Sequence, residues 1–553
     1  MIRLSEIKLT LAEAEHPDPT LLAAVSRILG VPREQVARVD IFKRSFDARK
    51  AELAAVYIVD VTVADPAQEP ALLARFADHP HIAPAPDMGW QAPVAAPALL
   101  ALRPVVVGFG PCGIFAALVL AQMGFRPIVL ERGKTVRQRT RDTWDMWRKG
   151  VLEPESNVQF GEGGAGTFSD GKLYSQVKDP RHLGRKVMNE FVKAGAPPEI
   201  LYVAHPHIGT FKLVKVVEHM REQIIALGGE IRFGQRVTDL RIEDGPQGRH
   251  LRGLTVLDQA SGQTSELRAD HAVLALGHSA RDTFAMLHER NVLLEAKPFS
   301  IGFRIEHPQG MIDRARWGRH AGHPLLGAAD YKLVHHASNG RTVYSFCMCP
   351  GGTVVAATSE PGCVVTNGMS QYSRNERNAN AGMVVGITPA DYPGGPLAGI
   401  VLQRQLESNA FVLGGGGYRA PGQLVGDFLA GRASTELGGV EPSYQPGVKL
   451  GDLGDALPAY AIAALREALP AFGRKIRGFD MPDAVLTGVE TRTSSPLRIT
   501  RGDDYQSLNV RGLFPAGEGA SYAGGILSAG VDGIRVGEAV AQDALRTSNL
   551  HPQ

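Results

Sequence analysis

The sequence has few cysteines, almost no net charge and no long apolar run. Four cysteines in 553 residues are too few for the disulfide framework of a small secreted protein. A net charge of +2 gives no general attraction to nucleic acid or to anionic membranes. No apolar run approaches the roughly 20 residues of a membrane-spanning helix, and residues 1–8 show no apolar core of a signal peptide. These absences favour a soluble cytoplasmic protein without a membrane partner.

Glycine, by contrast, is plentiful, and residues 104–133 carry the clearest glycine motif. There a β-branched run is followed by Gly108, Gly110 and Gly113, and then by an apolar helical pattern that ends at a further glycine. A second apolar run ends in Glu131. Strand, glycine turn, helix, strand and acid, in this order, predict a dinucleotide-binding unit of a doubly wound α/β fold.

Each of these residues has a physical task in such a unit. Gly108 allows the sharp turn, Gly110 leaves room for a pyrophosphate, and Gly113 lets the helix pack closely on the strand. The helix N-terminus adds unpaired N–H groups and the positive end of the helix dipole. Glu131 lies 23 positions after Gly108, near the roughly 20 expected of a carboxylate that binds a ribose hydroxyl. Because such an acid would repel the 2′-phosphate of NADP, the motif favours an unphosphorylated ribose.

A glycine-rich loop follows the motif. Five glycines fall within the eleven positions 161–171, and a backbone of this kind can wrap closely around a cofactor. The flanking Phe160 and Leu173 predict that the loop is anchored rather than free. Thr167 and Lys172 add hydrogen-bond donors for phosphate, ribityl or substrate groups.

The string Glu131-Arg132-Gly133 and the loop resemble a bacterial family of FAD-dependent dehydrogenases among the glutathione reductase-like flavoproteins. The similarity extends over essentially the whole chain. It continues through HPHIGT at 205–210, GHSARD at 277–282, FCMCPGG at 346–352, GVETRTSSP at 488–496 and PAGEGA at 515–520. The resemblance implies FAD as the cofactor and an oxidoreductase that transfers electrons or hydride through FAD to a small-molecule substrate.

The motif and the resemblance together predict the residues that bind FAD. The resemblance assigns the adenine to the backbone of Val237, the ribityl chain to Glu518, and the flavin edge to the helix that begins at Ile526. The full expected set is Gly108, Gly110, Pro111, Cys112, Gly113, Glu131, Arg132, Gly164, Gly166, Thr167, Val237, Gly277, Gly517, Glu518, Gly525 and Ile526. Only one complete nucleotide motif is present, so NAD(P)H as an electron donor must bind transiently or elsewhere.

The length and the order of these strings predict several domains. A small α+β domain of ferredoxin-like type is expected over residues 1–95. The FAD-binding domain is expected over 96–295 and again over 486–553, with an inserted mixed β/α substrate domain over 296–485. The fold class is therefore α/β, with a doubly wound, Rossmann-like core.

Lys172 and Arg492 are the candidate catalytic residues, as cations near the flavin, and Cys347 is a third. Cys347 and Cys349 are one residue too close for a C-x-x-C redox motif, so an ordinary loop near the flavin is the preferred interpretation. No His or Cys pair nearby has metal-ligand spacing, and no metal is expected.

Two other functions stay open. A flavoprotein that acts on RNA would use the N-terminal domain, with its basic residues 43–50, and residues 137–149, where arginines neighbour Trp144 and Trp147. A non-catalytic protein would hold FAD as a structural or sensing ligand. Nucleic acid is not the expected partner, because residues 1–100 carry more acidic than basic side chains.

Overall fold

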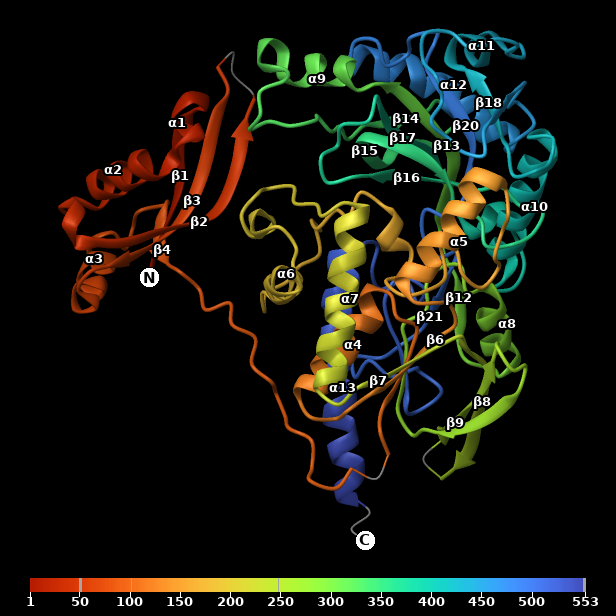
Figure 1. Ribbon diagram of the computed structural model, residues 1–553, viewed down its shortest axis with the longest axis horizontal. Helices are drawn as coiled ribbons and strands as arrows, with labels where there is room; N and C mark the ends of the chain where they lie inside the picture. The colour runs from red at the N-terminus through yellow and green to blue at the C-terminus, as the bar shows by residue number, and fades with distance from the viewer. Residues whose placement is uncertain (49–51, 101, 247, 551–553) are drawn as a thin grey trace.

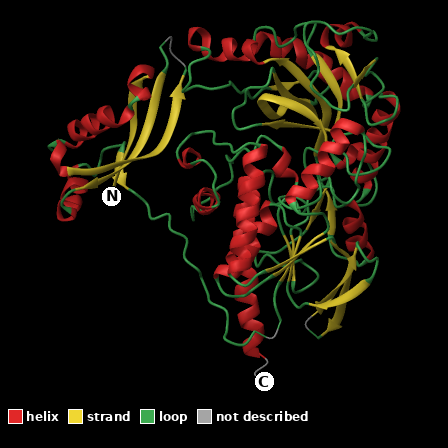
Figure 2. Ribbon diagram, in the orientation of Figure 1, coloured by secondary structure: helices red, strands yellow, loops and turns green. Residues whose placement is uncertain are grey.

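The computed structural model describes residues 1–48, 52–100, 102–246 and 248–550, which form an N-terminal lobe, a central lobe and an inserted lobe (Figure 1). Figure 2 shows the strands of the three main sheets as separate groups with helices around them. Among the described residues, no helix has the length and apolarity needed to cross a membrane.

The N-terminal lobe is a four-stranded antiparallel sheet covered by helices. Its strand order β2-β3-β1-β4 is that of a ferredoxin-like domain, as the sequence suggests. Alternate residues of β3, one of the two central strands, are fully buried, such as Ala55, Tyr57 and Val59. This is the period-2 pattern of a strand with one covered face. The elements are β1 (Ile2–Thr10), α1 (Leu11–Glu15), α2 (Pro17–Leu29), β2 (Val36–Asp47), β3 (Ala54–Val63), α3 (Glu69–Arg75) and β4 (Ile82–Pro84).

The central lobe is built on a five-stranded parallel sheet in the order β22-β11-β5-β6-β7. This is the doubly wound arrangement, in which the order of winding reverses between β5 and β11, and the predicted fold class is confirmed. The sheet strands are β5 (Val105–Val107), β6 (Ile128–Glu131), β7 (Glu230–Phe233), β11 (Ala272–Leu274) and β22 (Leu513–Pro515). The helices are α4 (Pro111–Gln122), α5 (Val136–Lys149), α6 (Leu183–Lys193), α7 (Thr210–Ala226), α8 (Arg281–Glu289) and α13 (Ile526–Leu550), and a side sheet holds β8 (Gln235–Gly245), β9 (Gly248–Asp258) and β10 (Thr264–Arg268).

The inserted lobe is an eight-stranded sheet in which β13 is buried along almost its whole length. β20 spans the boundary expected at residue 485 and pairs with β13, so the inserted sheet extends to Glu490. Its strands are β13 (Phe299–Pro308), β14 (Val334–His336), β15 (Thr342–Ala356), β16 (Thr366–Ser370), β17 (Asn378–Ile387), β18 (Ala420–Leu424), β19 (Val448–Leu450) and β20 (Val485–Glu490). Its helices are α9 (Gln309–Trp317), α10 (Ala398–Leu413), α11 (Val425–Ala430) and α12 (Ala459–Lys475), and β12 (Leu294–Ala296) pairs with β21 (Leu497–Ile499) beneath the sheet.

The last helix, α13, packs tightly on the first helix of the nucleotide motif, α4 (Figure 1). A Cβ atom added at Gly533 would lie 2.2 Å from the carbonyl oxygen of Cys112, and one at Gly537 would lie 2.6 Å from Val119. Glycine at these positions therefore lets the two helix backbones approach, although glycine itself weakens a helix. This contact joins the C-terminal part of the chain to the motif some 400 residues earlier.

The contact predicts that Gly533→Ala destabilises the protein. The added methyl group would overpack the interface between α4 and α13 and lower the free energy of unfolding by about 1–3 kcal/mol. The control is Gly310→Ala on α9, where a Cβ atom would meet only the flexible end of Arg314 at 3.4 Å. Thermal unfolding of both variants measures the difference, and equal midpoints would contradict the proposed steric role of Gly533.

Candidate functional site

The expected cofactor residues gather at one edge of the parallel sheet. Gly108 follows β5, Glu131 ends β6, Gly277 follows the end of β11, and Gly517 follows β22. All four strands are parallel, so their carboxyl ends meet at that edge. The winding reverses between β5 and β11 there, and this is where doubly wound sheets bind nucleotides.

Three glycines shape the turn between β5 and α4 in different ways. Gly108 has a φ of +99° and would place a Cβ atom 2.5 Å from the carbonyl oxygen of Ala275, and a Cβ atom at Gly113 would lie 1.9 Å from the carbonyl oxygen of Gly108. A Cβ atom at Gly110 would meet only backbone atoms of Gly164, at 3.5 and 4.0 Å. Gly108 and Gly113 are therefore required by the protein itself, whereas Gly110 leaves space in front of the helix.

That space lies at the N-terminus of α4, which begins with Pro111 and has no side-chain cap. Uncapped N–H groups and the positive end of the helix dipole favour a phosphate at such a position. The described residues therefore fit the pyrophosphate of FAD, and Gly110 stays the predicted point of closest approach.

Glu131 is buried and accepts three backbone hydrogen bonds. Oε2 accepts from the N–H of Phe109 at 2.8 Å, and Oε1 accepts from the N–H groups of Gly133 at 2.8 Å and Gly161 at 3.0 Å. The carboxylate thus ties the end of β6 to the glycine turn and to the glycine-rich loop. Oε1 already accepts two bonds, but Oε2 accepts only one and keeps a second lone pair, so the predicted contact with a ribose hydroxyl is compatible with these bonds.

Arg132 forms ion pairs with two acids. Its guanidinium donates to Glu155 at 2.8 and 3.0 Å and to Asp282 at 2.8 and 3.0 Å, and it lies 4.1 Å from the ring centre of Phe160. Val237, on β8, is buried and pairs with Val256. A direct FAD contact for Arg132 and Val237 stays a prediction.

The glycine-rich loop connects the N-termini of α4 and α13. A Cβ atom at Gly164 would lie 2.8 Å from the Cα atom of Gly110, and one at Gly166 would lie 2.9 Å from the side chain of Ile526, the first residue of α13. Thr167 is buried in the short 3₁₀ helix Ala165–Phe168, and its hydroxyl has no hydrogen-bond partner among the described residues. The loop is therefore anchored, as the sequence predicts.

The far end of the loop reaches the inserted sheet. Nζ of Lys172 donates to the carbonyl oxygen of Met348 on β15, and the neighbouring Asp170 accepts from Arg374 at 2.9 Å. Burial lowers the pKa of Lys172, but the nearby Cys347 and Cys349 outweigh it, and the pKa is raised. Lys172 therefore stays charged where the central lobe meets the inserted lobe.

Glu518 lies beside this junction. Burial raises its pKa to about 7, Lys297 opposes the shift, and the charge of Cys347 adds to it. The preceding Gly517 donates its N–H to Asp532 at 2.8 Å, and a Cβ atom at Gly517 would lie 2.8 Å from the Cβ atom of Cys112. The segment at Gly517, where the chain re-enters the central lobe, is thus packed against the glycine turn.

Arg492 sits in a buried network. Its guanidinium donates to both carboxylate oxygens of Glu407 at 3.0 and 2.8 Å and to the hydroxyls of Ser279 and Ser359 at 2.9 and 2.8 Å. Although burial raises the pKa of Glu407, Arg492 and Arg281 outweigh it and lower the pKa to about 2. Arg492 is therefore engaged within the protein, and its catalytic role stays a prediction.

Two of the arginines proposed for RNA docking, Arg137 and Arg139, are engaged within the protein. Arg139 is fully buried and donates only to backbone carbonyls, Arg137 pairs with Glu218 at 2.7 Å, and the indole of Trp147 donates to the carbonyl of Ala356 at 2.9 Å. Of the basic residues 43–50, positions 49 and 50 lie outside the described residues.

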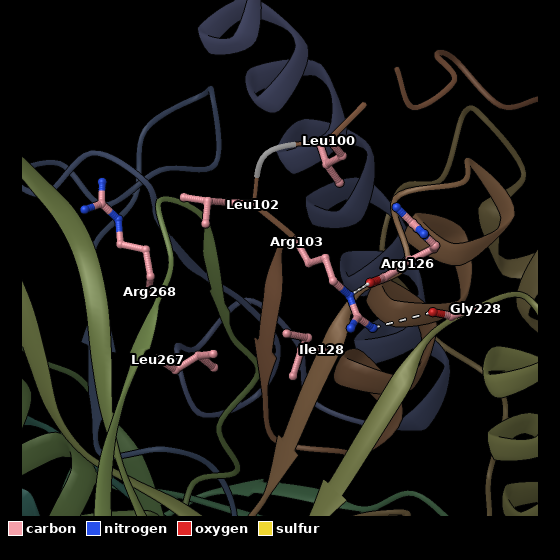
Figure 3. Close-up of a pocket in the computed structure, with 8 residues that line it drawn as sticks. All are labelled: Leu100, Leu102, Arg103, Arg126, Ile128, Gly228, Leu267 and Arg268. Carbon is pink, nitrogen blue, oxygen red and sulfur yellow. Dashed lines mark hydrogen bonds between the residues drawn. The ribbon is translucent and has the colours of Figure 1, made fainter. Parts of the chain in front are cut away.

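A cavity of about 460 Å³ lies at the opposite, amino-terminal edge of the parallel sheet (Figure 3). Arg103 crosses it and donates to the carbonyl oxygens of Arg126 at 2.5 Å and Gly228 at 3.5 Å. Its lining residues are Leu100, Leu102, Arg103, Arg126, Ile128, Gly228, Leu267 and Arg268. Because Arg103 precedes β5 and Ile128 begins β6, this cavity is separate from the nucleotide edge.

Comparison with known proteins agrees with the geometry of the site. An uncharacterized protein of Clostridium beijerinckii is 46% identical over 550 residues, which cover 98% of this chain and 98% of that protein. A family model described as FAD-dependent protein, C-terminal domain-like, matches residues 298–493, and a domain of unknown function matches residues 1–62. The chain belongs to this family of FAD-dependent proteins. FAD is its cofactor, as the motif predicts.

Solved structures resemble the chain more weakly. A geranylgeranyl bacteriochlorophyll reductase-like protein of Thermoplasma acidophilum is 12% identical with a TM-score of 0.34, covering 82% of this chain and 80% of that one. A 3-ketosteroid-Δ4-(5α)-dehydrogenase of Rhodococcus jostii is 13% identical with a TM-score of 0.36, covering 82% of this chain and 99% of that one. Similarity at this level carries no argument about the substrate of this chain.

Gly110→Val is expected to give a folded protein without FAD. The space at Gly110 accepts a Cβ atom in the protein itself, but the side chain would occupy the place of the pyrophosphate. Flavin absorbance per protein after gel filtration measures the loss, with Gly310→Val on α9 as the control. Full flavin occupancy in Gly110→Val would show that the phosphates lie elsewhere.

Glu131→Ala is expected to weaken FAD binding without preventing it. Loss of one charge-assisted hydrogen bond costs about 1.5–3 kcal/mol, or roughly 10- to 150-fold in the dissociation constant, and the three freed N–H groups loosen the turn further. Glu131→Gln keeps a neutral acceptor and should bind FAD with intermediate affinity. Titration of the apoproteins with FAD measures the three constants, and equal values would leave Glu131 a purely structural residue.

Proposed function

We propose that the protein is a glutathione reductase-like FAD-dependent oxidoreductase that passes electrons between FAD and a small-molecule substrate. The substrate would bind between the central lobe and the inserted lobe. NAD(P)H would serve as the electron donor. It would bind transiently or elsewhere, because the chain has only one complete nucleotide motif.

One observation carries this proposal: the glycine-rich loop spans from the glycine turn to the inserted sheet. It contacts Gly110 at one end, Ile526 in its middle and Met348 at Lys172. Residues expected at the phosphates, at the flavin edge and at the substrate are thus joined by one short segment. Such continuity is what a cofactor lying along the loop requires.

The protein residues at this junction have distinct proposed roles. FAD supplies the redox chemistry, and the protein binds and orients it and sets the local electrostatics. Lys172 would stabilise negative charge that develops on the cofactor or on an anionic substrate. Arg492 would act as a positioning residue, since it holds Ser279 and Glu407 in place.

The proposal is tested by anaerobic reduction of the purified protein. NADH, NADPH and dithionite are added in turn while the flavin spectrum is recorded, and any small molecule that co-purifies is identified by mass spectrometry. Reduction by a nicotinamide or by the identified compound supports an oxidoreductase. A flavin that no donor reduces would favour a structural or sensing role for FAD.

Lys172→Met is expected to lower the flavin midpoint potential. The substitution keeps much of the side-chain volume but removes the positive charge, and each 1.4 kcal/mol lost lowers the potential of a two-electron couple by about 30 mV. Lys178→Met, an exposed lysine of the same segment, is the matched control. Spectroelectrochemistry at equal FAD occupancy compares them, and an unchanged potential would remove Lys172 from the reactive face.

A further inference from the structure

Cys347 and Cys349 lie at a bulge in β15, next to Lys172. Phe346 of β15 pairs with Gly382 of β17, and Cys349 of β15 pairs with Asn380 of β17. Between these two pairs the chain advances by three residues on β15 but by only two on β17, which is a bulge. Cys347 has a φ of +43°, a left-handed conformation that non-glycine residues rarely adopt in a strand. Bulges of this kind redirect side chains and occur beside active sites.

The bulge brings the Cys349 side chain into contact with the backbone of Cys347. Sγ of Cys349 lies 3.4 Å from the carbonyl oxygen of Cys347. Two cations approach the same turn: Nη1 of the fully buried Arg304 donates to the carbonyl oxygen of Cys347 at 2.9 Å, and Lys172 donates to Met348. The pair therefore sits between positive charges from two different lobes.

Gly368, on the neighbouring strand β16, leaves the room in which Arg304 and Cys349 come together. A Cβ atom at Gly368, on β16, would lie 2.5 Å from Nη1 of Arg304 and 2.9 Å from Sγ of Cys349. The amide nitrogen of Asn380, a fully buried residue, has no hydrogen-bond partner among the described residues. A buried donor is therefore available beside the thiols.

The pKa values of the two thiols are shifted in opposite directions. A hydrogen bond from the Cys349 side chain, together with the charges of Lys172 and Arg304, outweighs burial and lowers the pKa of Cys347 below that of an ordinary thiol. The pKa of Cys349 is raised, first by this hydrogen bond and then by burial.

Two acidic groups that interact with the pair, Asp170 and Glu490, are themselves paired with arginines. Asp170 pairs with Arg374 at 2.5 Å, and Glu490 pairs with Arg304 at 3.0 Å. Burial and the charge of Cys347 raise the pKa of Glu518 to about 7, so this carboxyl is only partly ionised near neutral pH. Because Arg304 is balanced by Glu490, Lys172 supplies the net positive charge beside the pair, and the surroundings favour a thiolate on Cys347 over one on Cys349.

Access distinguishes Cys347 from the other cysteines. Cys347 is half-buried, whereas Cys112, Cys349 and Cys363 are buried. A thiolate with a lowered pKa, partly exposed and beside a second thiol, has the properties of an attacking cysteine with a resolving partner.

We propose that Cys347 is a nucleophile toward disulfides and that Cys349 resolves the product, so that disulfides are the substrate class of this site. The Cys347 thiolate attacks one sulfur of a disulfide RS–SR, a Cys347–SR bond forms, and RS⁻ leaves. The Cys349 sulfur, as it gives up its proton, then attacks Cys347, forms the Cys347–Cys349 disulfide and releases the second group as RSH. The protein pair is oxidised by two electrons and the substrate disulfide is reduced. The return of electrons to the pair rests on the proposed oxidoreductase function.

The test uses the FAD-loaded protein without an electron donor. The protein is reduced with a phosphine, the phosphine is removed, and 5,5′-dithiobis(2-nitrobenzoic acid), an aromatic disulfide, is added. The wild type should rapidly release two equivalents of aromatic thiolate and retain no adduct. Cys349→Ser should release one equivalent and retain a mixed disulfide on Cys347, visible by mass spectrometry. Cys347→Ser should lose the rapid phase.

A second measurement tests the ionised state of Cys347 without a disulfide. The rate of Cys347 alkylation by iodoacetamide, followed by peptide mass spectrometry against pH, should reach half its maximum well below the pH of about 8.5 typical of a free thiol. A Cys349→Ser variant that turns over fully, a rapid phase that survives Cys347→Ser, or alkylation with an ordinary midpoint would overturn the proposal. The flavin spectrum of each sample shows that the variants are folded. Neither readout needs flavin reduction, so failure here is distinct from failure of the proposed function.

Discussion

The carboxylate of Glu131 is the contact on which the rest of the site depends. It accepts N–H groups from the glycine turn, from its own strand end and from the start of the glycine-rich loop. Without it, three buried N–H groups would lack a partner, and each would carry a cost of about 1–3 kcal/mol. The carboxylate therefore sets where the loop leaves the parallel sheet, before any cofactor is considered.

Arg139 secures the next part of the same loop. Its buried guanidinium donates to the carbonyl oxygens of Asn157, Val158 and Glu162 at 2.7, 2.7 and 2.8 Å. Burial lowers its pKa to about 10, so it still carries its charge at neutral pH. A Cβ atom at Gly161 would lie 2.4 Å from the Arg139 side chain, which explains a glycine there. Arg139 thus holds the loop in place between Glu131 and Lys172.

The sequence was sufficient for the parts of the site that depend on local spacing. The turn at Gly108, the acid at Glu131 and the anchored loop follow from periodicity and glycine positions, and the doubly wound core follows from the order of strand, turn, helix and strand. It was not sufficient for contacts between distant segments. Nothing near Arg132 or Arg492 indicates that their partners are Asp282 and Glu407, because ion pairs between segments far apart in the sequence leave no local pattern.

The environment of Cys347 shows the same limit most clearly. A spacing of one residue between cysteines argues against a redox pair when the reference is the C-x-x-C motif, where a helix N-terminus lowers the thiol pKa. Here the pair lies on a strand, and Arg304 and Lys172 replace the helix dipole. A bulge rather than a helical turn brings the two residues together. The physical requirements of a reactive thiol pair, a nearby cation and a second thiol, can thus be met by a shorter spacing once the backbone departs from regular strand geometry.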